Sequence, residues 1–235
     1  MKSLRTKLKE VYKPCDVWIL ATRRTGSTLI QDLLNSLDSV SPKFRERTSN
    51  YLANNIQYPI NSKVFPDHMA FYDRTIPGLL EARPDIKFIH IRREDAVAEF
   101  VSNCMVGKTK IWHFDQFVGG GYDDAIHNNP FDFNKPWLEK QFLILQKDRK
   151  FWPELIKKYG LTTLELVYED LLSNPIKEFK KVLSFIDRPL KGVKKIMEGN
   201  KSTILHKKYE KEYEEIRELV KTLDSVKEYE KNENA

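Results

Sequence analysis

Apolar residues along the chain form two kinds of pattern, short continuous runs and stripes with helical spacing. The runs at 16–22 and 87–92 predict buried strands, and the run at 162–169 predicts a third strand. Residues 62–65 predict a further short strand. After the first run, five leucine and isoleucine residues share one helical face, which predicts a helix over 27–37 behind a tight turn.

Further helices are predicted where helical spacing separates these strands. Strands that alternate with helices indicate an α/β fold, in which a parallel sheet is covered by helices on both faces. Residues 38–61 and 119–124 are expected to be irregular. The expected helices are 68–82 with a break at Pro77, 94–106, 136–159, 175–187 and 207–230.

The length of the chain predicts a single domain, 1–235, with an N-terminal extension at 1–14 and a charged C-terminal helix or tail at 206–235. A helix with heptad-like spacing either docks on its own domain or pairs with a second copy, so a homodimer stays open. The last expected helix has this spacing at Tyr213, Ile216, Val220 and Leu223.

The net charge of +6 favours an anionic partner, although lysines interleaved with glutamates equally describe a solubilising surface. No apolar run is long enough to cross a bilayer, and the basic N-terminus lacks the apolar segment of a secretory signal. We therefore expect a cytoplasmic protein without stable membrane insertion. Cys15 and Cys104 are too few for a disulfide framework and are expected to be packing residues in a reducing compartment.

The segment ATRRTGST, 21–28, lies between the first predicted strand and helix. Gly26 permits a turn that would point backbone amides at an anion on the positive end of the helix. The guanidinium of Arg24 adds a positive charge that can donate two hydrogen bonds to an anion. The Gly-Lys pair that is typical of ATP-binding loops is absent. The alternative is a basic surface turn capped by Ser27. The candidate anion-binding residues are Arg23, Arg24, Thr25, Gly26, Ser27 and Thr28.

The segment FIHIRREDAVAEFVSN repeats this order of strand, arginine and helix start. Arg93 and Ser102 would meet near a strand's carboxyl end, where ligands of open parallel sheets bind, and could hold a second phosphate. In the alternative, Arg93 pairs with Glu94 or Asp95 and Ser102 faces solvent. Two phosphate sites indicate a nucleotide phosphorylated at both ends.

These segments resemble the sulfotransferases that use 3′-phosphoadenosine 5′-phosphosulfate (PAPS). The resemblance covers roughly 16–37, 87–112 and 162–187, and it is strongest to the bacterial trehalose 2-sulfotransferase type. It implies an α/β, P-loop-like three-layer fold with a central parallel sheet flanked by helices. The pattern of that type is matched by Arg93, Asp95, Ser102, Thr109 and Trp112.

The resemblance implies transfer of a sulfonyl group from PAPS to a hydroxyl acceptor, a small molecule or glycan such as a carbohydrate or glycolipid. The loop would hold the 5′-phosphosulfate, with Arg24 stabilising charge on the bridging oxygen. Arg93 and Ser102 would hold the 3′-phosphate. No metal is expected, because no His, Cys and Asp cluster has metal-ligand spacing.

The family's general base is often a glutamate after the first helix, which points to Glu46 here. His68 is the rival base. Lys63 resembles a lysine that the family often places ahead of its acceptor region, where it orients a substrate or caps a strand. The alternatives are a solvated Glu46 beside Arg45 and Arg47 and a structural His68.

Other classes of protein stay open at this point. A non-catalytic nucleotide- or phosphate-binding module is the main alternative, and a kinase is disfavoured by the missing Gly-Lys-Ser/Thr. Nucleic acid is not an expected partner, because the lysines are spread among glutamates. Trp112 and Phe114 either stack on adenine or belong to the core. Tyr168 and Glu169 are expected to be scaffold residues.

Overall fold

The computed structural model describes residues 16–109, 133–190 and 210–233, apart from positions 38, 41, 48, 56, 59, 70 and 71. Its contacts divide the chain into two compact units. Unit 1 comprises the described parts of 1–22, 26–92 and 151–200, and unit 2 those of 23–25, 93–150 and 201–235. The extension 1–14, Cys15, Trp112, Phe114 and the loop 119–124 lie outside the described residues.

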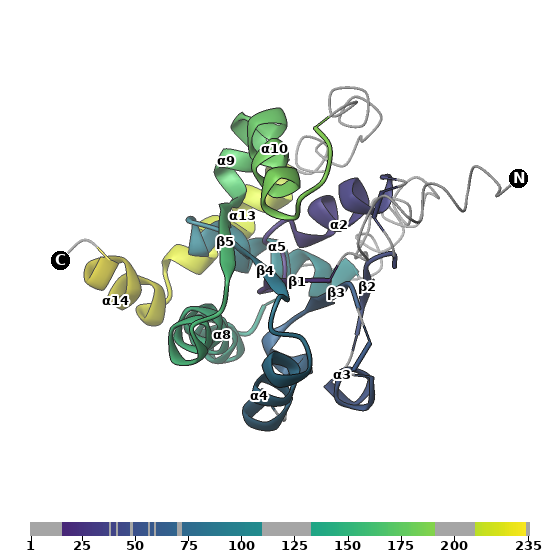
Figure 1. The fold of residues 1–235 in the computed structure, drawn as a ribbon. Helices are drawn as coiled ribbons and strands as arrows, with labels where there is room; N and C mark the ends of the chain where they lie inside the picture. The colour runs from purple at the N-terminus through teal and green to yellow at the C-terminus, as the bar shows by residue number, and fades with distance from the viewer. Residues whose placement is uncertain are drawn as a thin grey trace, which may run out of the picture. The chain divides into compact units, whose positions relative to one another are not determined.

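Unit 1 is built on a five-stranded sheet in the order β2-β3-β1-β4-β5, and every pair of neighbours is parallel (Figure 1). This confirms the predicted α/β fold with a parallel sheet. The strands are β1 (Val17–Ala21), β2 (Arg45–Glu46), β3 (Ser62–Val64), β4 (Lys87–Arg92) and β5 (Thr163–Val167).

Alternate residues of β1 belong to two separate apolar layers, one on each face of the sheet. Val17 and Ile19 pack with α2 (Ser27–Asn35) and α10 (Pro175–Phe185). Trp18 and Leu20 pack on the opposite face, with α4 (Tyr72–Ala82) and the end of α8 (Lys135–Tyr159). Figure 1 shows α2 and α10 above the sheet of unit 1 and α4 below it, so this unit has three layers.

The structure corrects two expectations for unit 1. Helix α4 begins at Tyr72 and continues through Pro77. The proline removes one helical hydrogen bond, and the burial of Ile76 and Leu79 offsets this loss. The segment expected to be irregular contains β2 and α3 (Ser49–Asn54). Both elements are too short to produce a periodic signal. The short helix α9 (Tyr168–Ser173) and the 3-10 turn η1 (Pro66–His68) complete the unit.

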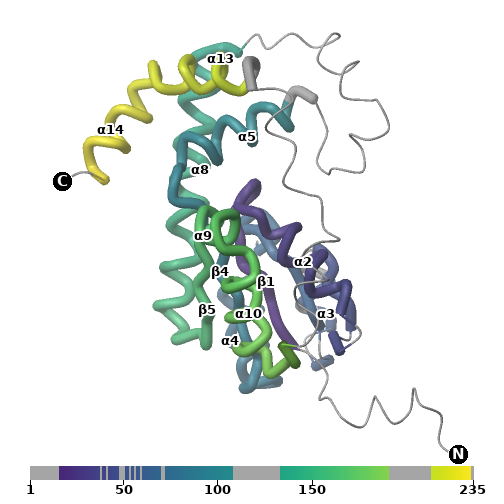
Figure 2. Tube along the Cα trace, turned by 90° about the horizontal axis from the view of Figure 1, so that it is seen from above, coloured from purple at the N-terminus to yellow at the C-terminus, as the bar shows by residue number. Residues whose placement is uncertain are grey.

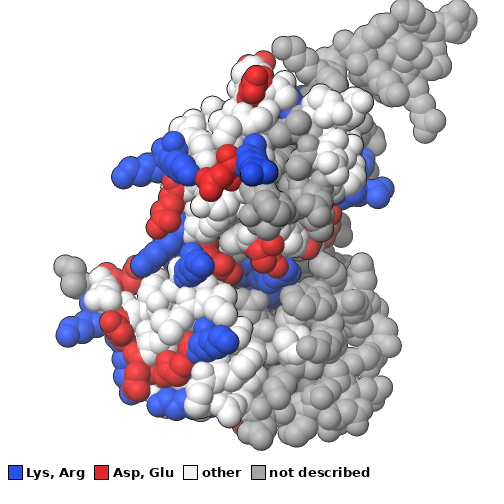
Figure 3. Space-filling view, turned by 90° about the horizontal axis from the view of Figure 1, so that it is seen from below, with Lys and Arg blue, Asp and Glu red and all other residues white. Residues whose placement is uncertain are grey.

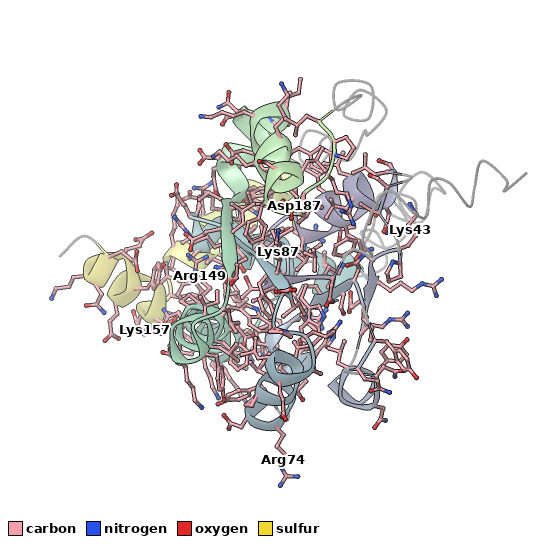
Figure 4. The ribbon with its side chains drawn as sticks, in the orientation of Figure 1. Lys43, Arg74, Lys87, Arg149, Lys157 and Asp187 are labelled. Carbon is pink, nitrogen blue, oxygen red and sulfur yellow. The ribbon has the colours of Figure 1, made fainter. Side chains whose placement is uncertain are left out.

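Charged side chains secure the end of α10. Lys87 donates to the carbonyl of Phe185 at 2.7 Å and to the carboxylate of Asp187 at 2.5 Å. Figure 4 shows Lys87 and Asp187 next to one another. Asp187 has a positive φ of 55°, which ends the helix, so the pair holds the C-terminal turn against β4.

Unit 2 consists of α5 (Ala96–Thr109), residues 135–150 of α8, α13 (Glu210–Lys221) and α14 (Asp224–Glu233). Figure 2 shows α13 beside α5. Its core is formed by Phe100, Val101, Leu138, Phe142, Ile216 and Val220 together with their neighbours. The predicted docking of the last helical segment is therefore confirmed.

The prediction of one continuous helix over 207–230 was wrong, because the chain breaks between α13 and α14. The backbone amides of Asp224 and Ser225 both donate to the carboxylate of Glu139, at 2.7 and 3.1 Å. This carboxylate caps α14 from α8, far away in the sequence. Cys104 is buried in this unit, and burial raises the pKa of its thiol to about 12.

In the described ranges, none of the helices combines the length and the apolar character that a membrane span requires. Figure 3 shows one face of the molecule, on which Lys and Arg side chains are interspersed with Asp and Glu side chains.

Candidate functional site

The loop between β1 and α2 has an uncommon backbone conformation at two positions. Arg24 has φ 68° and Gly26 has φ 81°. A positive φ is costly for a residue with a side chain, and such conformations concentrate at functional sites. The N-cap residue of α2 is Gly26, which has no side chain to accept a hydrogen bond. Ser27 is therefore not the capping residue. The first-turn amides of α2 therefore face the loop without a side-chain acceptor from their cap.

Gly26 also allows a close approach by the ring of Tyr168. A Cβ atom at position 26 would lie 2.5 and 2.8 Å from two carbons of this ring. Tyr168 begins α9 directly after β5, so the tyrosine shapes the turn where the loop enters α2.

We expect Gly26→Ala to destabilise the fold more than a comparable glycine substitution. The left-handed conformation costs an alanine about 1–2 kcal/mol, and overlap with the Tyr168 ring adds about 1–3 kcal/mol. Gly160→Ala is the matched control, because Gly160 has φ 59° and no atom within 4 Å of the added Cβ. Equal losses of unfolding free energy, measured by chemical denaturation, would show that the Tyr168 contact is unimportant.

In unit 2, residues from the two predicted phosphate motifs meet. The Nε atom of Arg24 donates to the hydroxyl of Ser102 at 3.0 Å. Ser102 is 5% exposed and Arg93 is 8% exposed. The alternative in which Ser102 faces solvent is therefore wrong, and the loop arginine contacts the helix of the second motif.

A second group of residues surrounds the start of α5. Asp95 accepts a hydrogen bond from the amide of Ala98 at 2.7 Å and forms an ion pair with Arg217 at 3.1 Å. Burial raises the pKa of the Tyr213 phenol, and the charges of Arg93 and Arg217 act in the opposite direction. The sequence motifs did not indicate that Tyr213 and Arg217 lie beside the start of α5, because α13 lies outside those motifs.

In unit 1, both candidate bases contact one another. The carboxylate of Glu46 lies 3.5 Å from Nε2 of His68 and 3.4 Å from Nζ of Lys63. Lys63 is 3% exposed and also donates to the hydroxyl of Thr28 at 3.2 Å, so it joins β3 to the first turn of α2. Glu46, which stands beside Arg45 and Arg47 in the sequence, therefore contacts Lys63 and His68 while its side chain stays exposed to solvent.

Exposure distinguishes the two candidate bases. The side chain of Glu46 is 42% exposed and that of His68 is 14% exposed. Nδ1 of His68 is buried and has no hydrogen-bond partner among the described residues. Glu46 is thus a solvent-accessible carboxylate held by a buried cation and an imidazole, an arrangement that can accept a proton from a bound hydroxyl.

The remaining site predictions have the following outcomes. Thr25 and Ser27 are buried within the loop segment. Thr109 ends α5. Within the part of the chain that the structure describes, no group of three or more His, Cys, Asp or Glu side chains is placed to hold a metal ion.

One family of known proteins matches more than half of the chain. A family model described as the sulfotransferase family matches residues 44–192, a range that includes Glu46, Lys63, His68, Arg93 and Ser102. The chain is similar to a crystal structure of a sulfotransferase from Alicyclobacillus acidocaldarius, with 10% identity and a TM-score of 0.48 over 77% of this chain and 83% of that one. No curated protein matches the chain.

Proposed function

Because the chain belongs to the sulfotransferase family, we propose that it transfers a sulfonyl group from PAPS to a hydroxyl acceptor. The observation that carries this proposal is the hydrogen bond between Arg24 and Ser102. A donor with phosphates at both ends requires residues from both motifs, and this contact supports their joint use. PAPS supplies an activated sulfonyl group bonded to the oxygen of its 5′-phosphate.

The residues of the two motifs have the chemistry that a nucleotide with two phosphate ends requires. Arg93 and Ser102 are a cation and a hydroxyl that are almost fully buried, and they would hold the 3′-phosphate. The first-turn amides of α2 and the hydroxyls of Ser27 and Thr28 would hold the 5′-phosphosulfate, with Arg23 and Thr25 beside them. Arg24 would donate to the bridging oxygen as its charge grows.

Glu46 would act as the general base of the transfer. Its carboxylate would take the proton of the acceptor hydroxyl as that oxygen bonds to sulfur and the bond from sulfur to the bridging oxygen breaks. His68 and Lys63 would orient this carboxylate, because each contacts one of its oxygens. The products would be a sulfate ester and 3′-phosphoadenosine 5′-phosphate.

We further propose a carbohydrate or glycolipid hydroxyl as the acceptor and the cytoplasm as the location. Both rest on the resemblance to the bacterial trehalose 2-sulfotransferase type. An acceptor screen with labelled PAPS tests the first of these, since sulfate would appear on sugars and not on phenols or amines.

Calorimetric titration tests the donor site directly. We expect micromolar binding of 3′-phosphoadenosine 5′-phosphate and much weaker binding of ADP and AMP. Arg24→Ala and Arg93→Ala should each weaken binding of the bisphosphate by at least about tenfold, the worth of one charged hydrogen bond.

Arg92→Ala is the matched control, because Arg92 precedes Arg93 but donates to Glu165 on β5. If the wild-type protein binds ADP or AMP as tightly as 3′-phosphoadenosine 5′-phosphate, the site assignment is overturned. Selective binding without turnover of any acceptor would instead favour the non-catalytic nucleotide-binding module.

A further inference from the structure

One face of α8 in unit 2 is both apolar and basic. In the range 136–150, the large apolar side chains of Trp137, Leu143 and Ile144 are 46%, 55% and 43% exposed. They do not continue the core, because Leu138, Phe142 and Leu145 are the residues of this helix that are buried against α5 and α13. We call the outward surface the α8 face; its exposed residues are Pro136, Trp137, Lys140, Leu143, Ile144, Lys147 and Lys150.

Helical geometry makes these residues one continuous surface. Trp137, Lys140, Ile144 and Lys147 follow at intervals of three and four residues, which places them on the same side of the helix. The ring of Phe133 stacks on Trp137, with centroids 6.2 Å apart and planes inclined by 14°. This contact holds the Trp137 indole at the surface.

The exposed residues of the α8 face include three lysines and no acid. The acids in this part of α8 are Glu139 and Asp148. The carboxylate of Glu139 is engaged by the backbone amides of Asp224 and Ser225 at the start of α14. The Asp148 side chain is only partly exposed and interacts with another group of the protein. The α8 face is therefore cationic around its apolar centre.

We propose that the α8 face docks on the surface of an anionic lipid bilayer. Trp137, Leu143 and Ile144 enter the headgroup region, where tryptophan is favoured at the boundary between water and hydrocarbon. Lys140, Lys147 and Lys150 extend to the lipid phosphates, since lysine side chains place their stems along apolar surface and their charge in water. This is docking at a surface, which requires no membrane-spanning helix.

The charge of the face decides against two other occupants. A second copy of the chain would place lysines against lysines in a symmetric contact, which costs free energy. A soluble polyanion would engage the lysines but gain nothing from three apolar side chains. The proposal is independent of sulfonyl transfer, so its failure leaves the proposed function untouched.

Sedimentation with vesicles tests the proposal on the full-length protein. We expect binding to vesicles of phosphatidylcholine with phosphatidylglycerol and little binding to phosphatidylcholine alone. With Trp112 replaced by phenylalanine throughout this comparison, tryptophan emission should shift to shorter wavelength with the anionic vesicles. The further change Trp137→Phe should remove this shift, because Trp18 and Trp152 are already fully buried. Absence of binding to the anionic vesicles would overturn the proposal.

Two triple variants separate the α8 face from general charge. Reversing Lys140, Lys147 and Lys150 to glutamate should weaken binding to anionic vesicles by at least about tenfold. The control reverses three exposed lysines of unit 1, Lys157, Lys177 and Lys180, and changes the net charge equally. Equal loss in both variants would show that the net charge and not the α8 face binds.

A third variant tests the apolar part of the face. Replacing Trp137, Leu143 and Ile144 with serine keeps every charge and should also weaken vesicle binding by at least about tenfold. Unchanged binding would overturn the proposal in favour of a polyanion site. Circular dichroism and the denaturation midpoint of each variant establish that the fold is intact before the binding comparison.

Discussion

Replacing Glu46 with glutamine is expected to lower turnover by about 100- to 10,000-fold while the affinity for 3′-phosphoadenosine 5′-phosphate stays unchanged. Glutamine has nearly the same shape but cannot accept the proton of the acceptor hydroxyl. Glu46 lies on β2, with its contacts to Lys63 and His68, whereas the proposed 3′-phosphate residues lie on or next to α5. The loss should therefore fall on turnover and not on binding of the nucleotide.

Two companion variants make this experiment decisive. Glu81→Gln removes an exposed carboxylate from α4 and should have no effect on turnover. His68→Gln removes the imidazole that contacts Glu46 and should cause a smaller loss than Glu46→Gln, because the carboxylate remains. The reverse order, with normal turnover in Glu46→Gln and a large loss in His68→Gln, would assign the base to His68.

Arg149→Met is expected to destabilise the protein by about 3–5 kcal/mol, because it removes a guanidinium that pairs with a buried carboxylate. Nη1 of Arg149 lies 2.6 Å from Oε2 of Glu99, whose side chain is fully buried on α5. Arg149 also donates to the carbonyl of Glu94 at 3.3 Å. Chemical denaturation followed by circular dichroism measures the loss of unfolding free energy.

The pairing can be separated from the packing of the arginine stem. The double variant Glu99→Gln with Arg149→Met removes both charges and should recover most of the lost stability. Lys221→Met breaks the exposed pair with Glu218 on α13, where an effect of at most about 1 kcal/mol is expected. If Arg149→Met is as mild as Lys221→Met, the buried pair does not hold α5 to α8.

The elements that the sequence predicted are those whose own residues produce a strong local pattern. Strands β1, β4 and β5 are rich in apolar and β-branched residues, and α2 and α10 have clear apolar faces. The loop motif was also visible in the sequence, because Gly26 is surrounded by Thr25, Ser27 and Thr28 shortly after a strand. Such patterns reflect short-range backbone preferences and burial periods, which need no knowledge of distant partners.

Other features depend on residues that are remote in the chain. Strand β2 has two residues and exists because it pairs with β3. The break between α13 and α14 depends on Glu139, which belongs to a different helix. Neither the strand nor the break has a local signature, since each is stabilised by hydrogen bonds that form only after the elements pack.

By itself the sequence determined the parallel α/β architecture of this protein and supplied the candidate site residues. Only the tertiary structure decided which of those residues meet. It brought Arg24 to Ser102, joined Glu46 to both Lys63 and His68, and placed Arg217 on Asp95. The physical reason is range: apolar periods and turn preferences act between neighbours in the chain, whereas hydrogen bonds and ion pairs form between side chains that folding brings within about 3–4 Å.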